Sequence, residues 1–458
     1  MKKIGLFCST IFHFYIYENI IKNISNNYVF ISPDLKDKKE NKKLMNFINN
    51  KGYQLFKEDE IIIGSSSIDI LLSPYWRPSF LLYPSNIKMV RLMYGYAKDD
   101  WNYADWNRYY DLILTYGEYA QHKLKKFNNS VAVGNPRIYG IEQKLKNEPI
   151  QDIKGRYFLD FKKKEKLTIL YAPTWGDLSS FAYVRQYIEH LSEEFNFIVK
   201  AHHLFSVKDD VKFNQLIQDF KIFYCDEQTD LFSLIHVSDL MISDYSGAIF
   251  DGILSGINTV LVNGKLSNTL EKETHLEGIV RNKLKVLNTN SFTKLLQDIQ
   301  DVFKNTKYRN NIYQLQKELF INVNTTENIF KDIQRALQSL NNKSSDNQKS
   351  QYNKRELLIK LLESNNKNIV ICGGGEFGRS VLSFCKANKG NVSLIVDNYC
   401  EESSIDNVPV LKMNDLLCLS TEKIKSNFYL IATKNGAEYF QNKLEQMDLR
   451  EVEDFYLL

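Results

Sequence analysis

The sequence has little of what marks a secreted, membrane-spanning or nucleic-acid-binding protein. Its 458 residues include only 8 prolines and 6 cysteines, and the cysteines form no CxxC pair. This scarcity argues against a disulfide framework and a cysteine zinc site, and it fits free thiols in a reducing cytoplasm. No apolar run approaches the roughly 18 residues that a membrane span requires. The formal net charge of +4 is small for this length and gives no nucleic-acid footprint.

What the sequence does have is an alternation of short apolar runs with amphipathic segments. The early runs of strand type are KIGLFCS, NYVFISP, EIIIGSS, KMVRLMYG, LILTYG and VAVGNPR. Tyr15–Ile24 and Lys36–Asn49 lie between them and have helical spacing. After a Lys-rich passage the pattern restarts with LTILYAPTW, FIVKAHH, KIFYCDE, LMISDYS and TVLVNG. Such alternation predicts parallel, doubly wound α/β sheets, and the N-terminal MKKIGLFCS is expected to be a strand, not a signal peptide.

The chain divides into three Rossmann-like units. We predict a first lobe on the acceptor side over residues 1–150 and a nucleotide-donor lobe over residues 151–340. The predicted helices from residue 291 onward close this second lobe. Residues 341–353 are polar, lack apolar side chains at their start and are predicted to be a linker. Residues 354–458 are predicted to form a C-terminal Rossmann-like domain for nucleotide binding or assembly.

The segment from Asp239 to Gly256 carries the strongest site signal. A strand is followed by Asp244, then by Ser246 and Gly247 at a predicted helix start, with Asp251 about one and a half turns into the helix. Free backbone N–H groups and the positive end of a helix dipole favour a phosphate at such a place. The alternative is that Ser246 only caps the helix while Asp244 closes a turn.

Polar residues at neighbouring strand ends favour the phosphate site. YAPTW places Thr174 after one strand, and Lys200 with His202 and His203 ends the next. Cationic and donor groups at the carboxyl ends of parallel strands are placed to neutralise a diphosphate or to move a proton. Arg137, in GNPR after the last strand of the first lobe, is expected to reach the same cleft.

The segments GNPR, YAPTW, KAHH and SDLMISDYSGAIFD, in this order, resemble the motifs of the CDP-glycerol glycerophosphotransferase family. The resemblance covers roughly residues 1–340 and implies a two-lobed GT-B architecture. It implies that His202 contacts the donor diphosphate and that Ser246 and Gly247 bind the donor phosphate. It also implies that Asp251 is an acidic residue near the donor.

The sequence departs from that family at two places. His203 stands where the family usually has proline, and Tyr94-Gly95 stands where the family has a His-Gly dipeptide with its expected base. A tyrosine titrates near pH 10 and is a poor base at neutral pH. Either Tyr94 therefore plays a positional role, or the base lies elsewhere. His13 is the candidate substitute, with a solvent-facing helix residue as its alternative. Weaker candidates are Asp99, Asp100 and Asp105.

The C-terminal unit carries a dinucleotide-type fingerprint. Gly373, Gly375 and Gly378 follow the strand NIVIC, and Asp397 ends the strand SLIVD about 20 residues later. The unit resembles Rossmann-like modules attached to surface-polysaccharide enzymes, some of which bind nucleotides. Binding of a nucleotide there, and a purely structural role, both stay open.

These observations predict a transferase that moves glycerol or ribitol phosphate from a CDP-activated donor to a glycan or lipid-linked acceptor in capsule or teichoic-acid-like synthesis. The alternative is a GT-B glycosyltransferase that uses a nucleotide sugar. An oxidoreductase driven by the C-terminal domain and a non-catalytic scaffold are further hypotheses. We expect no metal and no required cofactor. The expected location is the cytoplasm, with peripheral attachment to the inner membrane face and oligomerisation left open.

Overall fold

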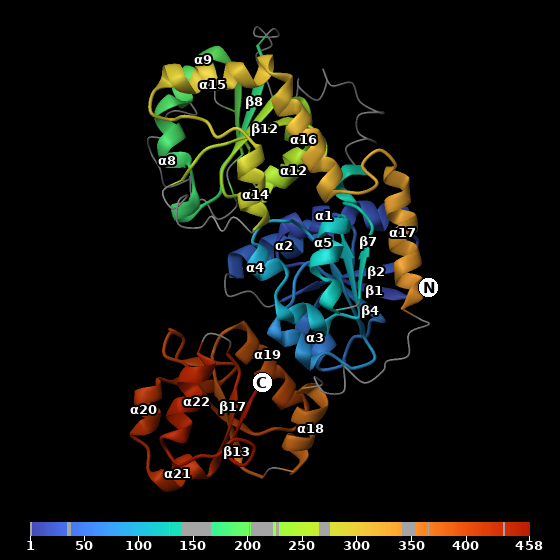
Figure 1. Ribbon diagram of the computed structural model, residues 1–458. Coiled ribbons are helices and arrows are strands. Elements are labelled where there is room, and N and C mark those ends of the chain that lie inside the picture. The colour runs from blue at the N-terminus through green and yellow to red at the C-terminus, as the bar shows by residue number, and fades with distance from the viewer. Residues whose placement is uncertain are drawn as a thin grey trace.

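The computed structural model describes residues 2–33, 38–127, 129–139, 166–200, 202, 223–225, 229–264, 275–340, 354–364, 366–433 and 436–458. The described strands form three sheets in chain order, and each sheet is flanked by helices (Figure 1). All strand pairs are parallel except β15 with β16 in the third sheet. The predicted α/β class with Rossmann-like units is therefore confirmed.

The first sheet has the strand order β3-β2-β1-β4-β5-β6-β7. Its strands are β1 (Lys3–Phe7), β2 (Asn27–Ser32), β3 (Leu55–Lys57), β4 (Ile70–Ser73), β5 (Lys88–Leu92), β6 (Leu112–Thr115) and β7 (Ser130–Ala132). The helices between them are α1 (Ile11–Asn23), α2 (Lys38–Asn50), α3 (Glu58–Ile62), α4 (Asp99–Asn102) and α5 (Glu118–Lys123), with 3-10 turns η1 (Pro78–Leu82), η2 (Asp105–Tyr109) and η3 (Lys125–Phe127). The central strands are buried because helices cover both faces.

One predicted strand of this lobe is wrong. EIIIGSS lies in α3 and the turn after it, and the strand that follows is β4, which begins at Ile70. The carboxylate of Glu60 accepts from the backbone N–H of Lys57 at 3.3 Å at the start of the helix, and Ile61 and Ile62 bury its apolar side. A short run of isoleucines fits a strand and a buried helical turn equally well, so periodicity alone could not separate them.

The second sheet has the order β10-β9-β8-β11-β12, and its predicted strands are confirmed. They are β8 (Thr168–Ala172), β9 (Asn196–Lys200), β10 (Phe223–Cys225), β11 (Leu240–Ser243) and β12 (Asn258–Leu261). The helical elements are η5 (Gly176–Leu178), α8 (Phe181–Val184), η6 (Arg185–Tyr187), α9 (Ile188–Glu194), α11 (Leu231–Val237), α12 (Ala248–Ser255), α14 (Leu276–Lys283), α15 (Phe292–Lys304), α16 (Thr306–Leu319) and α17 (Thr326–Ser339).

The last helix of this stretch, α17, lies against the first lobe and does not close the second (Figure 1). Phe330 packs edge-on against Tyr139 at 4.9 Å, and the side-chain amide of Asn322 donates to the carbonyl of Val133. The apolar face of α17 finds its partner where the first lobe ends, because Gly134 leaves room for Ile329. The chain therefore crosses back between the lobes before residue 340.

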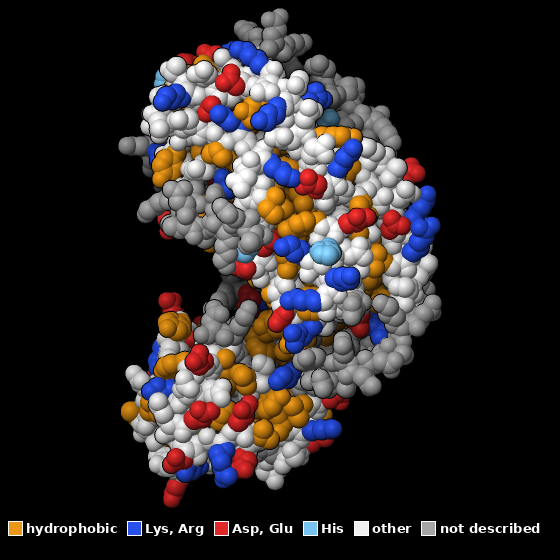
Figure 2. Space-filling model, viewed as in Figure 1, with side chains coloured by type: hydrophobic (Ala, Val, Ile, Leu, Met, Phe, Trp, Pro, Cys, Tyr) orange, Lys and Arg blue, Asp and Glu red, His pale blue; other side chains and the backbone are white. Residues whose placement is uncertain are grey.

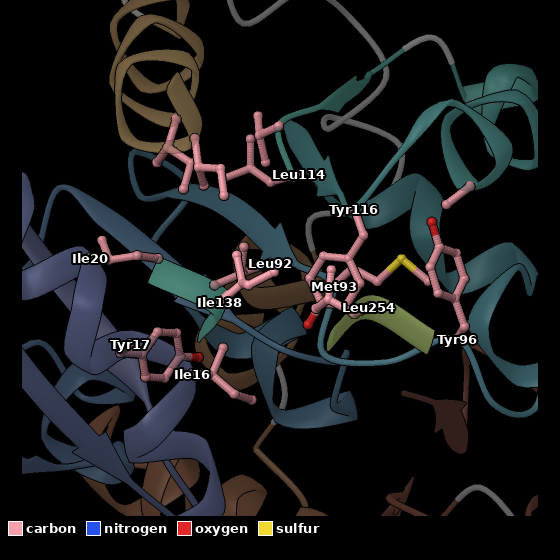
Figure 3. Close-up of a cluster of buried hydrophobic side chains, with 14 of the residues drawn as sticks. Ile16, Tyr17, Ile20, Leu92, Met93, Tyr96, Leu114, Tyr116, Ile138 and Leu254 are labelled. Atoms are coloured by element: carbon pink, nitrogen blue, oxygen red, sulfur yellow. The ribbon is translucent and has the colours of Figure 1, made fainter. Parts of the chain in front are cut away.

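The two lobes share one hydrophobic cluster. It joins α1 and the first sheet to α12 of the second lobe, and Figure 3 shows Leu254 beside Met93 and Tyr116. Tyr96 adds to the junction, since its ring lies 5.6 Å from Phe250 and its hydroxyl donates to the carbonyl of Leu319. This packing holds the carboxyl ends of both sheets near a common interface.

The third sheet, order β15-β16-β14-β13-β17-β18, forms the C-terminal domain. Its strands are β13 (Asn368–Cys372), β14 (Val392–Val396), β15 (Ser404–Ile405), β16 (Val408–Leu411), β17 (Asn427–Ile431) and β18 (Phe455–Leu457). Its helices are α18 (Lys354–Ser364), α19 (Glu376–Ala387), α20 (Met413–Leu417), α21 (Thr421–Lys425) and α22 (Ala437–Glu445). The predicted linker lies outside the described residues.

The C-terminal domain is docked on the first lobe, away from the second (Figure 1). One buried apolar cluster runs from the first lobe into α18 and α19 and includes Ile61, Ile62, Leu82, Leu358 and Phe384. The guanidinium of Arg355 donates to the carbonyls of Ile62 and Leu82 across this contact. The domain is therefore packed onto the lobe that carries the acceptor-side residues.

The surface shown in Figure 2 has Lys and Arg side chains interspersed with Asp and Glu. Neither sign forms a continuous field on this face. Among the described helices, none is long and apolar enough to cross a membrane. The five cysteines whose side chains are described are free thiols: Cys8, Cys372, Cys385, Cys400 and Cys418.

Candidate active site

The second sheet reverses its strand order between β8 and β11. From β8 the chain moves outward through β9 and β10, and from β11 it moves the other way to β12. Ligands of open α/β sheets bind outside the carboxyl ends of the strands at such a reversal. The residues that follow the two strands are Thr174 and Asp244, so the YAPTW and SDYSG segments meet there.

Asp244 organises this meeting point. One carboxylate oxygen accepts from the backbone N–H of Thr174 at 2.7 Å, and the other accepts from the backbone N–H and hydroxyl of Ser180 at 2.8 and 2.9 Å. Burial raises the pKa of the carboxyl to about 6, against the lowering effect of these hydrogen bonds. Ser180 also bonds the hydroxyl of Tyr171 at 2.8 Å. The ionised carboxylate of Asp244 therefore holds the loop after β8 against the loop after β11.

The helix start after β11 is open. Gly247 precedes α12, and a Cβ built on it would meet no atom of the described residues within 4 Å. The hydroxyl of Ser246 accepts from the backbone N–H of Ala248 at 3.2 Å, which is part of the capping role that the sequence left open. A capping hydroxyl and a ligand-binding helix start are compatible here, because no described residue crowds the Cβ position of Gly247.

Aromatic and cationic side chains surround this helix start. Trp175 is 45% exposed, and its ring lies 6.3 Å from that of His202. Lys200 ends β9, while His203 lies outside the described residues. Arg281 of α14, which the sequence analysis missed, lies over the ring of Tyr245 at 3.8 Å, and its charge acts on Asp244.

Arg137 joins the two lobes instead of standing free in the cleft. It is 4% exposed, with its guanidinium 3.2 Å from Asp251 of α12 and 3.4 Å from Asp230 beside α11. It also lies over the rings of Phe12 and Phe232, at 4.9 and 4.2 Å. Asp251 is correspondingly committed to Arg137, and burial raises the pKa of its carboxyl to about 6 against the opposing effect of that cation.

His13 lies at the strand-order reversal of the first sheet. The order reverses between β1 and β4, and the residues after these strands include Ser9 and Tyr75. His13 is 6% exposed, so the alternative of a solvent-facing helix residue is wrong. Ser9 contacts the His13 Nδ1 through its backbone N–H at 3.2 Å and its hydroxyl at 3.3 Å, and the hydroxyl also bonds that of Tyr75 at 2.7 Å.

The Ser9 amide decides which nitrogen of His13 carries the hydrogen. A backbone N–H can only donate, so Nδ1 is an acceptor in this arrangement. A neutral imidazole has one donor nitrogen, and its hydrogen therefore lies on Nε2. Neutral His13 is a hydrogen-bond donor through Nε2, and taking up a substrate proton there would require the other tautomer and loss of the Ser9 contact.

Tyr94 belongs to an aromatic group around His13. Its ring lies 6.2 Å from His13, 6.4 Å from Tyr75 and 6.1 Å from Trp101. Burial raises the pKa of its phenol above the usual value, which keeps the hydroxyl protonated at neutral pH. Tyr94 thus has the chemistry of a positioning or donor group and not of a base.

The acidic residues after Tyr94 make structural contacts. Asp99 accepts from the backbone N–H of Leu276, and Asp100 lies 3.2 Å from His275, so both link the first lobe to α14. Asp105 is paired with Lys126 at 3.0 Å. The guanidinium of buried Arg91, in β5, holds the segment after that strand through hydrogen bonds to Asn102 and Asn107.

The glycine loop of the C-terminal domain is closed by Asp397. Its carboxylate accepts from the backbone N–H groups of Gly374, Tyr399 and Cys400 at 2.6 to 2.8 Å. A Cβ on Gly378 would meet the carbonyl oxygen of Gly373 at 1.8 Å, so close helix–strand packing requires the glycine. Gly375 is open, but Glu376 places a negative charge in the first turn of α19, which opposes a phosphate there.

Among the described residues, no group of three or more His, Cys, Asp or Glu side chains is arranged to hold a metal ion.

Comparisons with known proteins point to one family. Residues 97–254 match the sequence profile described as CDP-glycerol:poly(glycerophosphate) glycerophosphotransferase. A teichoic acid poly(glycerol phosphate) polymerase of Bacillus spizizenii is 30% identical over 129 residues, which cover 26% of this chain and 31% of the relative. One from Bacillus subtilis is 31% identical over 138 residues, which cover 28% of this chain and 17% of the relative. The chain thus spans less than a third of the length of these curated relatives.

The fold is shared with a solved polymerase. A structure of the wall teichoic acid polymerase TagF, in a variant soaked with CDPG, has a TM-score of 0.52 and 15% identity, and it covers 74% of this chain and 89% of that chain. A second TagF structure has a TM-score of 0.51 at the same identity and coverage. The likeness establishes the two-lobed GT-B architecture over the first two units.

Proposed function

We propose that this chain, which belongs over residues 97–254 to the CDP-glycerol:poly(glycerophosphate) glycerophosphotransferase family, transfers a polyol phosphate from a CDP-activated donor to a hydroxyl acceptor. The observation that carries the proposal is the open helix start at Ser246 and Gly247, set by Asp244 at the strand-order reversal of the second sheet. The family match includes this segment, and the relatives' names supply the donor class.

On the donor side, the diphosphate of the CDP-polyol would lie at the start of α12. Backbone N–H groups and the helix dipole favour the negative charge there. His202 and Lys200 at the end of β9, together with Arg281, supply positive or donor groups. Trp175 is 45% exposed next to His202, and an exposed indole ring can stack on a nucleobase.

In the reaction, an acceptor oxygen attacks the β-phosphorus of the donor. The new O–P bond forms as the bond between the β-phosphorus and the bridging oxygen breaks, and CMP leaves with that oxygen and its electron pair. The hydroxyl proton passes to solvent or to a first-lobe group. Phosphoryl transfer has a loose transition state and depends mainly on positioning and electrostatic stabilisation, so a strong base is not essential.

On the acceptor side, His13 and Tyr94 would orient the attacking hydroxyl or the transferred phosphate. Neutral His13 donates through Nε2 in the observed arrangement, and protonated Tyr94 adds a second hydroxyl. The acceptor class we propose is a glycan or polyol-phosphate chain, lipid-linked at the inner membrane face. The aromatic rings around His13 give such a chain an apolar surface to lie on.

The second candidate is a glycosyltransferase of the same architecture. Only the strand-order reversal favours this candidate, because sites at such reversals bind nucleotide ligands of many kinds. Purified protein offered CDP-glycerol, CDP-ribitol and several nucleotide sugars, each with a polyol-phosphate acceptor, separates the two. Release of CMP from a CDP-polyol supports the proposal. Release of a nucleoside diphosphate from a nucleotide sugar, with no CMP, would favour the glycosyltransferase.

Donor affinity is expected to fall as pH is lowered through about 6. Protonation of Asp244 removes acceptor strength from the oxygens that hold Thr174 and Ser180, and the donor loop loosens. Titration of CDP-glycerol binding by calorimetry between pH 5 and 8 measures this. An Asp244→Asn variant should bind weakly and lose the pH step. A rise in affinity at low pH would count against the Asp244 account.

A further inference from the structure

The glycine-rich loop of the C-terminal domain lies against the first lobe through Glu376. This residue begins α19, and its carboxylate accepts from the guanidinium of Arg77 at 2.7 Å. Arg77 follows β4 at the strand-order reversal of the first sheet, and it also faces the buried carboxylate of Glu58 at 3.9 Å. The motif that the sequence predicted as a nucleotide site therefore contacts the edge of the sheet that carries His13.

A set of contacts leads from Arg77 to His13. Arg77 and Tyr75 lie two positions apart on the segment after β4, and both pack against the ring of Phe7. The hydroxyl of Tyr75 lies 2.7 Å from the hydroxyl of Ser9. Ser9 in turn contacts the Nδ1 of His13 through its hydroxyl and its backbone N–H. All these groups are at least partly buried, so competition from water is reduced.

The donors in this chain all point one way. Because Nδ1 of His13 accepts from the Ser9 amide, the Ser9 hydroxyl also donates its hydrogen to Nδ1. The Ser9 oxygen then accepts from the hydroxyl of Tyr75. Glu376 fixes the guanidinium at the far end by a charge-assisted bond. The order of donors thus holds the His13 ring in the orientation and tautomer in which Nε2 is the donor.

We propose that the C-terminal domain positions His13 for the transfer reaction, with Glu376 acting through Arg77, Tyr75 and Ser9. The inference rests on the proposed function for the role of His13, and it gives the third domain a task that requires no bound nucleotide. Glu376, Arg77, Tyr75 and Ser9 are positioning residues, since each acts on the substrate only through His13.

The test compares two contacts of the same helix with the first lobe. Glu376→Ala breaks the contact to Arg77, and Ser383→Ala breaks the contact of Ser383 with Asp59 of α3 at 2.7 Å. With CDP-glycerol as donor, Glu376→Ala is expected to lower kcat on the order of tenfold with little change in the KM for donor, as misplacement of a catalytic group does. Ser383→Ala should retain the wild-type kcat. Equal losses in both variants would overturn the proposal.

A double-mutant cycle with Tyr75→Phe tests the chain itself. This variant removes only one hydroxyl and leaves the domain contact in place, so it remains informative even if Glu376→Ala folds poorly. Because both residues act through the same chain, the double variant is expected to be no slower than the slower single one. Losses that multiply would mean independent effects and would contradict a shared chain.

Hydrogen exchange of the Ser9 amide provides a readout that needs no activity. This amide is protected by the His13 ring, so the peptide containing Ser9 should exchange faster in Glu376→Ala and Tyr75→Phe and unchanged in Ser383→Ala. If the wild-type protein released no CMP yet showed this exchange pattern, the proposed function would fail and the positioning link would stand. Unchanged exchange in Glu376→Ala would overturn the link whatever the activity.

Discussion

Replacing Gly247 with valine is expected to lower kcat/KM for the nucleotide donor about a hundredfold, the scale of losing one preorganised donor to a phosphate or oxyanion. A Cβ added at position 247 would meet no atom of the described residues within 4 Å, and the backbone there, with φ of −56°, accepts residues other than glycine. The valine therefore fills the space reserved for the donor without straining the fold. Steady-state kinetics with CDP-glycerol, together with an unchanged thermal unfolding midpoint, would show this.

A size series and a distant glycine make the test specific. Gly247→Ala should lose less activity than Gly247→Val, because one methyl group leaves part of the space open. Gly436→Ala is the matched control: Gly436 precedes α22 of the C-terminal domain, and its added methyl would make only ordinary contacts of 3.4 Å or more. Wild-type kinetics in Gly247→Val would place the donor elsewhere.

Replacing Arg137 with alanine is expected to destabilise the junction between the lobes by about 3–5 kcal/mol, the usual cost of leaving a buried charge without its partner. The substitution leaves the buried carboxylate of Asp251 on α12 without its cation, and it also removes the packing over Phe12 and Phe232. Thermal unfolding followed by circular dichroism should show a lowered first transition.

An exposed ion pair gives the comparison for Arg137. Lys283→Ala removes the partner of Glu318 at 2.7 Å, where the two side chains are 37% and 51% exposed, so a change of about 0–1 kcal/mol is expected. Adding Asp251→Asn to Arg137→Ala should recover part of the loss, because the neutral amide needs no cation. If Arg137→Ala unfolds like Lys283→Ala, the lobes are held by apolar packing alone.

The donor side of the site followed from the sequence because strand ends are local features. Apolar runs ending in Asp244, Thr174 and Lys200 identified strands whose carboxyl ends carry polar groups. Parallel strands put such ends on one edge, so the grouping could be expected before the strand order was known. The strand-order reversal between β8 and β11 supplies the reason for the grouping.

The acceptor side did not follow, because its contacts join residues far apart in the chain. Ser9 meets Tyr75 across 66 positions, and Arg77 meets Glu376 across 299. The strand β4 that brings Tyr75 to Ser9 was itself missed in favour of EIIIGSS. No local pattern marks a serine hydroxyl that will orient a histidine, so the sequence singled out His13 without its partners.

Three predicted binding residues make structural contacts in this conformation. Asp397 binds the backbone of its own loop, and Arg137 and Asp251 bind each other. Motif spacing fixes where a carboxylate stands on an element, but a buried carboxylate takes whichever donors the tertiary structure offers. That choice depends on packing between the lobes, which the spacing does not encode.

The fate of the donor phosphorus tests the account most directly. CDP-glycerol labelled with ³²P at the phosphorus next to glycerol would be incubated with the protein and a glycerol-phosphate acceptor, and the products separated. Attack on that phosphorus, held at the start of α12, predicts label on the acceptor, unlabelled CMP, and loss of both in Gly247→Val. Label that leaves as CDP, or transfer that persists in Gly247→Val, would contradict it.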